Sequence, residues 1–272
     1  MVRAVRAEWL KFGTTRMWWV LLLVLVGYVA FTSGLLAIMF GVLGDQLAQD
    51  PTAPQIPPDA LAAIVYSSVT AVGYVIPLIL GTLAVTGEVR YRTLTPTFLA
   101  TPSRGVALVS KVVVMFVAGA GYGAVGLAAA IGVGAPIIAA TGGDLQLVEA
   151  ATWTLAARAV LAMALWAAIG VGVGSLIQNQ VAAVVIVLAF TQFVEPLLRF
   201  GSAFWEPAAQ VGRFLPGSAS DALVGASIFS SFSGGGMAVV PLNWWQGGLV
   251  LAVLAAVVAF AGYLTAWRRD VT

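Results

Sequence analysis

Six long apolar runs dominate this sequence of 272 residues and constrain its fold more than any other feature. A helix that crosses the hydrocarbon core of a bilayer needs about 20 mostly apolar residues. The runs are 17–43, 61–87, 106–140, 153–177, 181–200 and 244–267. Only 9% of the residues are charged, against about 25% in soluble domains, so the chain cannot shield this apolar surface from water. The sequence therefore predicts an all-α integral membrane protein, a single domain over 1–272 with six transmembrane helices.

Two of these spans need interpretation. The run 106–140 is long for one span and fits a bilayer if it tilts or projects beyond the membrane. Only Gln178, Asn179 and Gln180 separate the fourth and fifth runs, and they form either a tight hairpin or a kink in one helix. A continuous helix of about 48 residues would overshoot any bilayer, so the hairpin is favoured.

Basic residues fall mostly on one side of this six-span arrangement. Cytoplasmic loops carry an excess of lysine and arginine, so we expect both termini in the cytoplasm and the chain in the cell membrane. An odd number of spans would spoil the segregation. The expected cytoplasmic side holds ten of the thirteen basic residues: Arg3, Arg6, Lys11, Arg16, Arg90, Arg92, Arg104, Lys111, Arg268 and Arg269. The other side holds Arg158, Arg199 and Arg213, with eight of the eleven acidic residues.

Two segments outside the spans have patterns of their own. Residues 1–16 predict a basic amphipathic helix in the headgroup layer; the alternative is an ordinary charged tail. Its apolar stripe is Val2, Val5, Trp9 and Phe12, with Arg3, Arg6, Glu8 and Lys11 off the stripe. In 201–243, prolines and glycines interrupt short apolar pieces such as Ala222–Phe232. There we expect half-helices that re-enter from the outer face, because structureless loops of this length are uncommon; a loose external loop is the alternative.

The residue types that most often carry chemistry are scarce. The sequence has no cysteine and no histidine, which removes thiolate and imidazole metal ligands and the commonest general base. The phosphate-binding pattern G-x-x-x-x-G-K-[ST] is also absent. We expect no catalytic residue, no metal site and no cofactor site in this chain, which is predicted not to be an enzyme.

Charges at membrane depth are the remaining candidates for function. Glu195 and Arg199 are spaced to form an i,i+4 ion pair; the alternative is a proton-coupling or substrate-binding carboxylate at Glu195. Arg158 could pair with Glu149 or reach the outer headgroups. Glycines within the spans are expected to let helices pack closely, namely Gly119, Gly123, Gly126, Gly170, Gly172 and Gly174.

The segment Glu88–Arg104, EVRYRTLTPTFLATPSR, lies between the second and third runs, on the side of the termini. It contains, in order, an acidic residue, a basic run with a threonine, a Phe-Leu pair and Pro-Ser-Arg. A lysine follows in the next apolar run. These are Glu88, Arg90, Arg92, Thr93, Phe98, Leu99, Pro102, Arg104 and Lys111. The order resembles that in the membrane permeases of type-2 ABC exporters. Arg92 departs from the pattern, since many members have glycine there.

The rest of the chain is similar to the same family in outline. The similarity covers the N-terminal segment, the six spans, the short turn at 178–180 and Leu215-Pro216-Gly217 before the last run. It implies the transmembrane permease subunit of an ATP-driven exporter, in which the 88–104 loop forms a coupling helix that docks on a separate ATPase. The implied contacts are Glu88, Arg90, Arg92, Thr93, Phe98, Leu99, Pro102 and Arg104, with a second contact at Gln178, Asn179 and Gln180.

The resemblance also implies the partners. Two permease chains, identical or related, would pair with two ATPase subunits that bind ATP and Mg²⁺, among membrane lipids and without nucleic acid. The apolar interior suggests a hydrophobic or amphipathic cargo, such as a drug, a lipid, a peptide or a lipid-linked molecule.

The physical pattern of the loop agrees with a docking role. Pro96 and Pro102 would bound a short helix, and Phe98 and Leu99 would supply apolar anchors, although the arginines could instead only bind anionic headgroups. Two other functions stay open: a membrane sensor or scaffold that transports nothing, and an ion-coupled carrier centred on Glu195.

Overall fold

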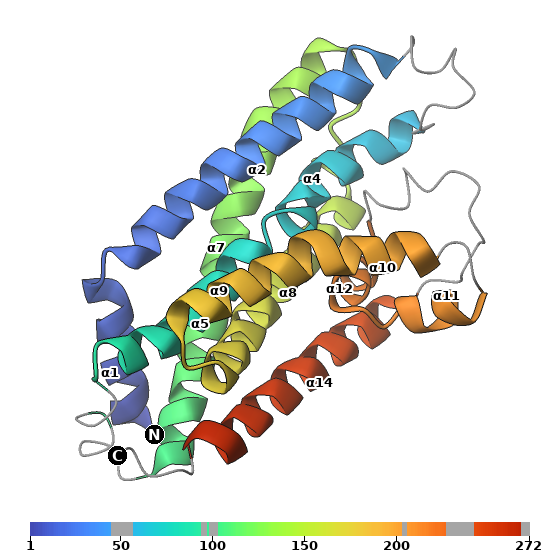
Figure 1. The fold of residues 1–272 in the computed structure, drawn as a ribbon. Helices are drawn as coiled ribbons and strands as arrows, with labels where there is room; N and C mark the ends of the chain where they lie inside the picture. The colour runs from blue at the N-terminus through green and yellow to red at the C-terminus, as the bar shows by residue number, and fades with distance from the viewer. Residues whose placement is uncertain (45–56, 94–96, 98–102, 203–205, 227–241, 268–272) are drawn as a thin grey trace.

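The computed structural model describes residues 1–44, 57–93, 97, 103–202, 206–226 and 242–267, and over these ranges the chain is helical, with no β-strand (Figure 1). Six helices are long and apolar enough to cross a membrane, as the sequence predicts. They are α2 (Met17–Gly41), α4 (Leu61–Ala71) with α5 (Val75–Arg90), α7 (Arg104–Ala140), α8 (Ala150–Leu176), α9 (Gln180–Ala189) with α10 (Glu195–Ser202), and α14 (Trp244–Gly262). Outside them lie α1 (Val2–Thr14), the 3₁₀ turn η1 (Pro58–Ala60), α11 (Glu206–Gly212) and α12 (Pro216–Val224). Two π-helical turns, η2 (Phe190–Val194) and η3 (Tyr263–Trp267), lie within the fifth span and after α14.

The relative directions of α5, α8 and α9 show that the chain reverses between the fourth and fifth spans. Along α5 and α8, the Tyr74 ring meets Trp166 at 4.4 Å between centroids, and Gly174 lies against the Thr82 backbone, so these two helices run the same way. Along α9 the order is opposite, because Gln180 accepts a hydrogen bond from Arg90 and the Thr191 carbonyl accepts one from Tyr74. The hairpin prediction is therefore confirmed.

Both ends of the described chain lie at one end of the helix bundle (Figure 1). Helix α1 contacts the start of α7 through Lys111 and Glu8, and Tyr263 of η3 lies beside Gly105 at the same end. We call this the terminal end, which also holds the C-terminal end of α5 and the turn at 177–179. The distal end is the opposite one, where α4 begins and α10 ends.

Glycines bring the spans into backbone contact, as the sequence predicts. A Cβ added to Gly170 of α8 would lie 2.1 Å from the carbonyl oxygen of Leu78, and one added to Gly81 of α5 would lie 2.1 Å from that of Ala167. Only a hydrogen fits at such crossings, so backbones can approach closely. The other predicted glycines have neighbouring atoms within 3.0 Å of an added Cβ: Gly119, Gly123, Gly126, Gly172 and Gly174.

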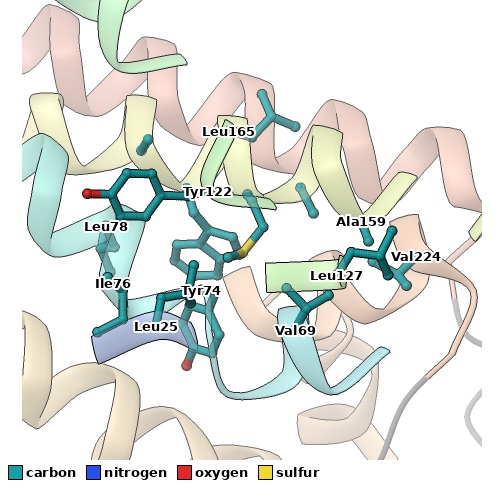
Figure 2. Close-up of a cluster of buried hydrophobic side chains, with 14 of the residues drawn as sticks. Leu25, Val69, Tyr74, Ile76, Leu78, Tyr122, Leu127, Ala159, Leu165 and Val224 are labelled. Carbon is teal, nitrogen blue, oxygen red and sulfur yellow. The ribbon is translucent and has the colours of Figure 1, made fainter. Parts of the chain in front are cut away.

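The core lies around α8. Within the most apolar window of each span, 78% of α8 is buried against 17% of α14, so α8 is central and α14 is peripheral. Figure 2 shows side chains from α2, α4, α5, α7, α8 and α12 meeting in one cluster, with Leu25, Val69, Tyr74, Tyr122 and Val224 among them.

Three spans differ from the single, regular helices that their apolar runs predict. The run 61–87 is not one helix, because α4 ends at Ala71 and α5 begins at Val75. The fifth span contains the π-helical turn η2, a local widening that is frequent at functional sites. Helix α7 has 37 residues, a length of about 55 Å, so it exceeds the thickness of the hydrocarbon core.

The segment before the last span is helical where the structure describes it. Helix α12 starts earlier than the expected piece Ala222–Phe232 and ends at Val224, followed by Gly225 with a left-handed φ of 86°. It packs against α8 and α14, where Trp166 donates a hydrogen bond to Ser220. Residues 227–241, and with them the remainder of that piece, lie outside the described residues.

Candidate functional site

A cluster of four charged side chains joins three helices at the terminal end. Glu8 and Lys11 come from α1, Glu88 from the last turns of α5, and Lys111 from the second turn of α7. Helix α1 places Glu8 and Lys11 on one face because residues three apart are neighbours on a helix. The two carboxylates and two ammonium groups balance in charge.

The contacts within this terminal ion cluster are short. Lys111 Nζ lies 2.5 Å from Glu8 Oε2 and 3.0 Å from Glu88 Oε1. Lys11 Nζ lies 2.7 Å from Glu8 Oε1 and 2.8 Å from Glu88 Oε1. Each lysine thus bridges both glutamates, so the four side chains together link α1, α5 and α7.

Burial makes this cluster different from surface ion pairs. The side chain of Lys111 is 3% exposed, against 40% for Lys11, and Glu8 is the buried residue of α1. Exposed pairs contribute about 0–1 kcal/mol, whereas removing one partner of a buried pair leaves an uncompensated charge and costs about 3–5 kcal/mol. One acceptor, Glu88 Oε2, is buried and has no hydrogen-bond partner within the described chain.

The cluster shifts the pKa values of the two residues on α1. Burial alone would raise the pKa of the Glu8 carboxyl, but the charge of Lys111 and the hydrogen bonds from both lysines lower it below its ordinary value. Burial would lower the pKa of Lys11, yet its bonds to Glu8 and Glu88 raise it. Both groups are therefore held in their charged forms.

The cluster also reaches the predicted coupling loop. Lys11 Nζ donates a hydrogen bond of 3.0 Å to the hydroxyl of Thr97, and that hydroxyl donates to the carbonyl of Thr93 at 2.9 Å. Among the predicted loop contacts, Glu88 is buried in the cluster, whereas Arg90, Arg92 and Thr93 are exposed. Arg104 begins α7 and is half-buried. Phe98, Leu99 and Pro102, with Pro96, lie outside the described residues.

At the start of the loop the chain turns through an arginine whose backbone has a left-handed conformation. Helix α5 ends at Arg90, after which the amide of Thr93 donates to the carbonyl of Glu88 and that of Arg92 donates to Val89. These two bonds form a Schellman motif, whose C′ position strongly favours glycine. Arg92 occupies this position with a φ of 54°.

The predicted second contact lies beside the first. Arg90 Nη1 donates a hydrogen bond of 3.3 Å to Gln180 Oε1, so the loop start and the 178–180 turn meet at the terminal end. Asn179 caps α9, where its side chain accepts bonds of 3.0 and 3.1 Å from the amides of Val181 and Ala182. Gln178 is exposed.

The other predicted charges lie away from the terminal end. Arg199 is 3.9 Å from Glu195 Oε1, but its closer partners are Asp221 and Ser218 of α12, each at 2.8 Å. The predicted i,i+4 pair is therefore present only at long range, and Asp221 is the main carboxylate partner.

Arg158 meets an aromatic ring rather than the expected Glu149, and its alternative contact with the outer headgroups stays a prediction. Its guanidinium lies 4.7 Å from the centre of the Trp244 ring, a cation–π contact between α8 and α14. Among the described residues Glu149 makes no ion pair with it.

The sequence pattern did not indicate the terminal ion cluster. Glu88 and Lys111 were noted for their positions in the motif, but Glu8 and Lys11 stand in a segment predicted to lie on the headgroups. The available signal was the placement of an acid within an otherwise basic helix, Glu8 among Arg3, Arg6 and Lys11.

Comparison of the sequence with models of known protein families and with curated proteins finds no match. The identity of the site therefore depends on its own geometry and on the resemblance in the loop.

Proposed function

We propose that this chain is the transmembrane permease subunit of an ATP-driven exporter, coupled to separate ATPase subunits through the 88–104 loop. The observation that carries the proposal is the terminal ion cluster, which fastens the start of that loop to α1 and α7. A loop that receives force from a partner needs a stiff attachment to the membrane helices, and a buried ionic network supplies one.

The packing of α5 gives this attachment a route into the bundle. Glu88 lies in the last turns of α5, and the same helix meets α8 in backbone contact at Gly81 and Gly170. Close-packed interiors transmit strain. A push on the loop would therefore shift α5 and α7 together and carry α8 with them.

Arg92 supports the resemblance to type-2 ABC permeases. The family pattern has glycine at this place in many members, and here the backbone takes the left-handed conformation that glycine favours. The same turn is thus built from a different residue. The adjacency of Arg90 and Gln180 also supports one continuous docking face made of the loop and the 178–180 turn.

The remaining features of the proposal follow from the charge pattern and the resemblance. The terminal end would face the cytoplasm of the cell membrane, α1 would lie in the headgroup layer, and α12 would be part of a re-entrant segment from the outer face. Two such chains, identical or related, would pair. The cargo would be hydrophobic or amphipathic, because the described spans bury few charges.

Reconstitution with an ATP-binding-cassette ATPase from the same source organism tests the proposal. Nanodisc-embedded protein should co-purify with that ATPase and stimulate ATP hydrolysis, and shortening Pro96–Pro102 should abolish stimulation while six-span insertion persists. Failure to associate in any lipid mixture would sink the proposal. Association without ATP-dependent export would favour the sensor or scaffold instead.

A second function, an ion-coupled carrier centred on Glu195, is favoured by one observation. Glu195 is 2% exposed, and its Oε2 atom has no hydrogen-bond partner within the described chain. Buried carboxylates within spans often belong to ion or proton pathways. This function predicts that Glu195→Gln abolishes transport and that ATP is irrelevant, whereas the exporter requires ATP.

A further inference from the structure

A cavity of about 160 Å³ lies toward the distal end, between the break in the second span, the π-helical turn η2 with α10, and the start of α12. Its lining includes Thr70 and Tyr74 from the second span, Thr191, Gln192 and Glu195 from the fifth, and Asp221 from α12. A water molecule has a share of about 30 Å³ in the liquid. The space therefore suits a ligand of about five non-hydrogen atoms.

The charges around this cavity leave one carboxylate oxygen without a partner. Arg199 donates to Asp221 at 2.8 Å, so these two charges compensate each other. Glu195 accepts a hydrogen bond from the Gly217 amide through Oε1, and its Oε2 is buried with no partner among the described residues. The side chain is 2% exposed. With all three side chains ionised, the cavity carries a net charge of −1.

Three of the four hydroxyl groups that line the cavity offer acceptors rather than donors. Thr70 donates its proton to the carbonyl of Ser67 at 2.9 Å, and Thr191 donates to that of Val187 at 2.8 Å. Tyr74 donates to the carbonyl of Thr191 at 3.2 Å. Because each hydroxyl carries a single proton, these three groups keep only lone pairs for a ligand. The fourth hydroxyl, that of Ser220, accepts a bond from Trp166.

The C-terminal end of α4 reinforces this preference, while at the start of α12 the Gly217 amide already donates to Glu195. Helix α4 ends at Ala71, and Thr70, Ala71 and Val72 line the cavity. The last carbonyl groups of a helix carry partial negative charge, and the ends of broken membrane helices bind cations in this way. Gln192 gives an amide proton to Thr191 Oγ1 at 3.4 Å and keeps its carbonyl oxygen as a further acceptor.

We propose that this cavity binds the ammonium group of a small protonated amine, with Glu195 as its counter-ion and the Thr70, Thr191 and Gln192 oxygens as further acceptors. An ammonium group supplies a positive charge, which offsets the net −1 of the cavity, and three donors for these acceptors. A transition-metal or divalent ion fits less well, because no group of three or more histidine, cysteine, aspartate or glutamate side chains that could hold one occurs among the described residues. The inference does not depend on coupling to an ATPase, since binding is measured on the permease alone.

Titration calorimetry on the full chain in phosphatidylglycerol nanodiscs tests the proposal with n-propylammonium as the probe. The amine should bind, while propan-1-ol, of similar shape without charge, and tetramethylammonium, a cation without N–H donors, should not. Glu195→Gln should weaken binding by about tenfold or more, because a charge-assisted bond is lost. Equal binding of propan-1-ol or tetramethylammonium would overturn the proposal, as would unchanged binding to Glu195→Gln.

Two variants control for folding and position. Glu149→Gln makes the same chemical change at an exposed site between α7 and α8 and should bind the amine like the wild type. If Glu195→Gln fails to fold, Gln192→Met at the exposed rim should weaken binding several-fold. Full binding by a folded Gln192→Met protein would contradict the site, and so would loss of binding in Glu149→Gln.

The amine could come from water or from a lipid headgroup, and one further arm separates these sources. Nanodiscs that contain phosphatidylethanolamine should block n-propylammonium binding if the lipid headgroup enters the cavity. If they leave the titration unchanged, the aqueous amine is the ligand. Phosphatidylcholine, whose headgroup has no N–H donor, should never block it, and a block by that lipid would contradict recognition through hydrogen bonds.

Discussion

Within the terminal ion cluster, substitution of the more deeply buried lysine, Lys111, should lower stability more than substitution of Lys11. The side chain of Lys111 is 3% exposed and bridges Glu8 and Glu88. Lys111→Met would leave two buried carboxylates with one lysine and should lower the free energy of unfolding by about 3 kcal/mol or more. Titration with SDS in mixed micelles measures this change. Lys11→Met, at a side chain that is 40% exposed, is the matched control and should cost clearly less; equal losses would contradict the difference in burial.

The pKa shift of Glu8 predicts how acid affects α1. A carboxyl whose pKa is lowered in the folded state contributes stability above its ordinary value of 4.5 and loses it as pH falls through the folded value. Lys11, with a raised pKa, keeps its contribution until pH rises above 10.5. Hydrogen exchange of residues 2–14, corrected for intrinsic rates, should therefore show constant protection from pH 8 to about pH 5 and weaker protection below about pH 4.5. A Glu8→Gln protein should lack this response, and a loss of protection already at pH 6 would point to another group.

Arg92 offers a test of the turn that starts the loop. A left-handed residue other than glycine costs roughly 1–2 kcal/mol, and Arg92→Gly would remove this cost. Glycine loses more backbone entropy on folding, so the net gain in the free energy of unfolding should be up to about 1 kcal/mol. Arg92→Val, β-branched at the same φ of 54°, should be destabilising. Thermal unfolding of the two variants in one detergent compares them directly. The opposite order would show that the turn is not left-handed in the membrane.

Helices α5 and α8 cross in backbone contact, and this crossing makes its own prediction. A Cβ at Gly170 would lie 2.1 Å from the Leu78 carbonyl oxygen, a backbone atom that cannot turn aside. Gly170→Ala should therefore destabilise the protein by about 1–3 kcal/mol or more. Gly121→Ala on α7 has no atom within 4 Å and should be neutral or stabilising by up to about 1 kcal/mol. The SDS titration distinguishes them, and equal effects would exclude close packing as the cause.

The elements also show what sequence alone could predict. The spans were predictable because apolar runs of about 20 residues have few other uses, and Gln178-Asn179-Gln180 marked the hairpin through its polarity. The break at Val72–Tyr74 was not, since Gly73 stands there without a proline. The partners of Glu8 and Arg199 were also unpredictable. Glu8 meets Lys111 across 103 positions and Arg199 meets Asp221 across 22, and such pairs depend on how helices cross, which no local pattern encodes.

At the scale of the whole molecule, polar chemistry divides between two ends. The terminal end holds a charge-balanced cluster tied to the loop, and toward the distal end lies a cavity with one unpartnered carboxylate oxygen. Packed helices α5 and α8 connect them, because Glu88 and Tyr74 lie at opposite ends of α5. An exporter that takes force at one end and handles a ligand near the other would need this separation.

Site-specific photo-crosslinking tests the central claim, that a partner ATPase docks at the terminal end. The chain has no cysteine, so a single introduced cysteine can carry a benzophenone label. Two positions report on the two ends of the bundle. Tyr91→Cys lies within the loop at a side chain that is 72% exposed, and Val148→Cys lies between α7 and α8 at a side chain that is 98% exposed. With the co-reconstituted ATP-binding-cassette ATPase present in nanodiscs, we predict an adduct to the ATPase from position 91 and none from position 148. No adduct from position 91, or equal adducts from both positions, would contradict the account.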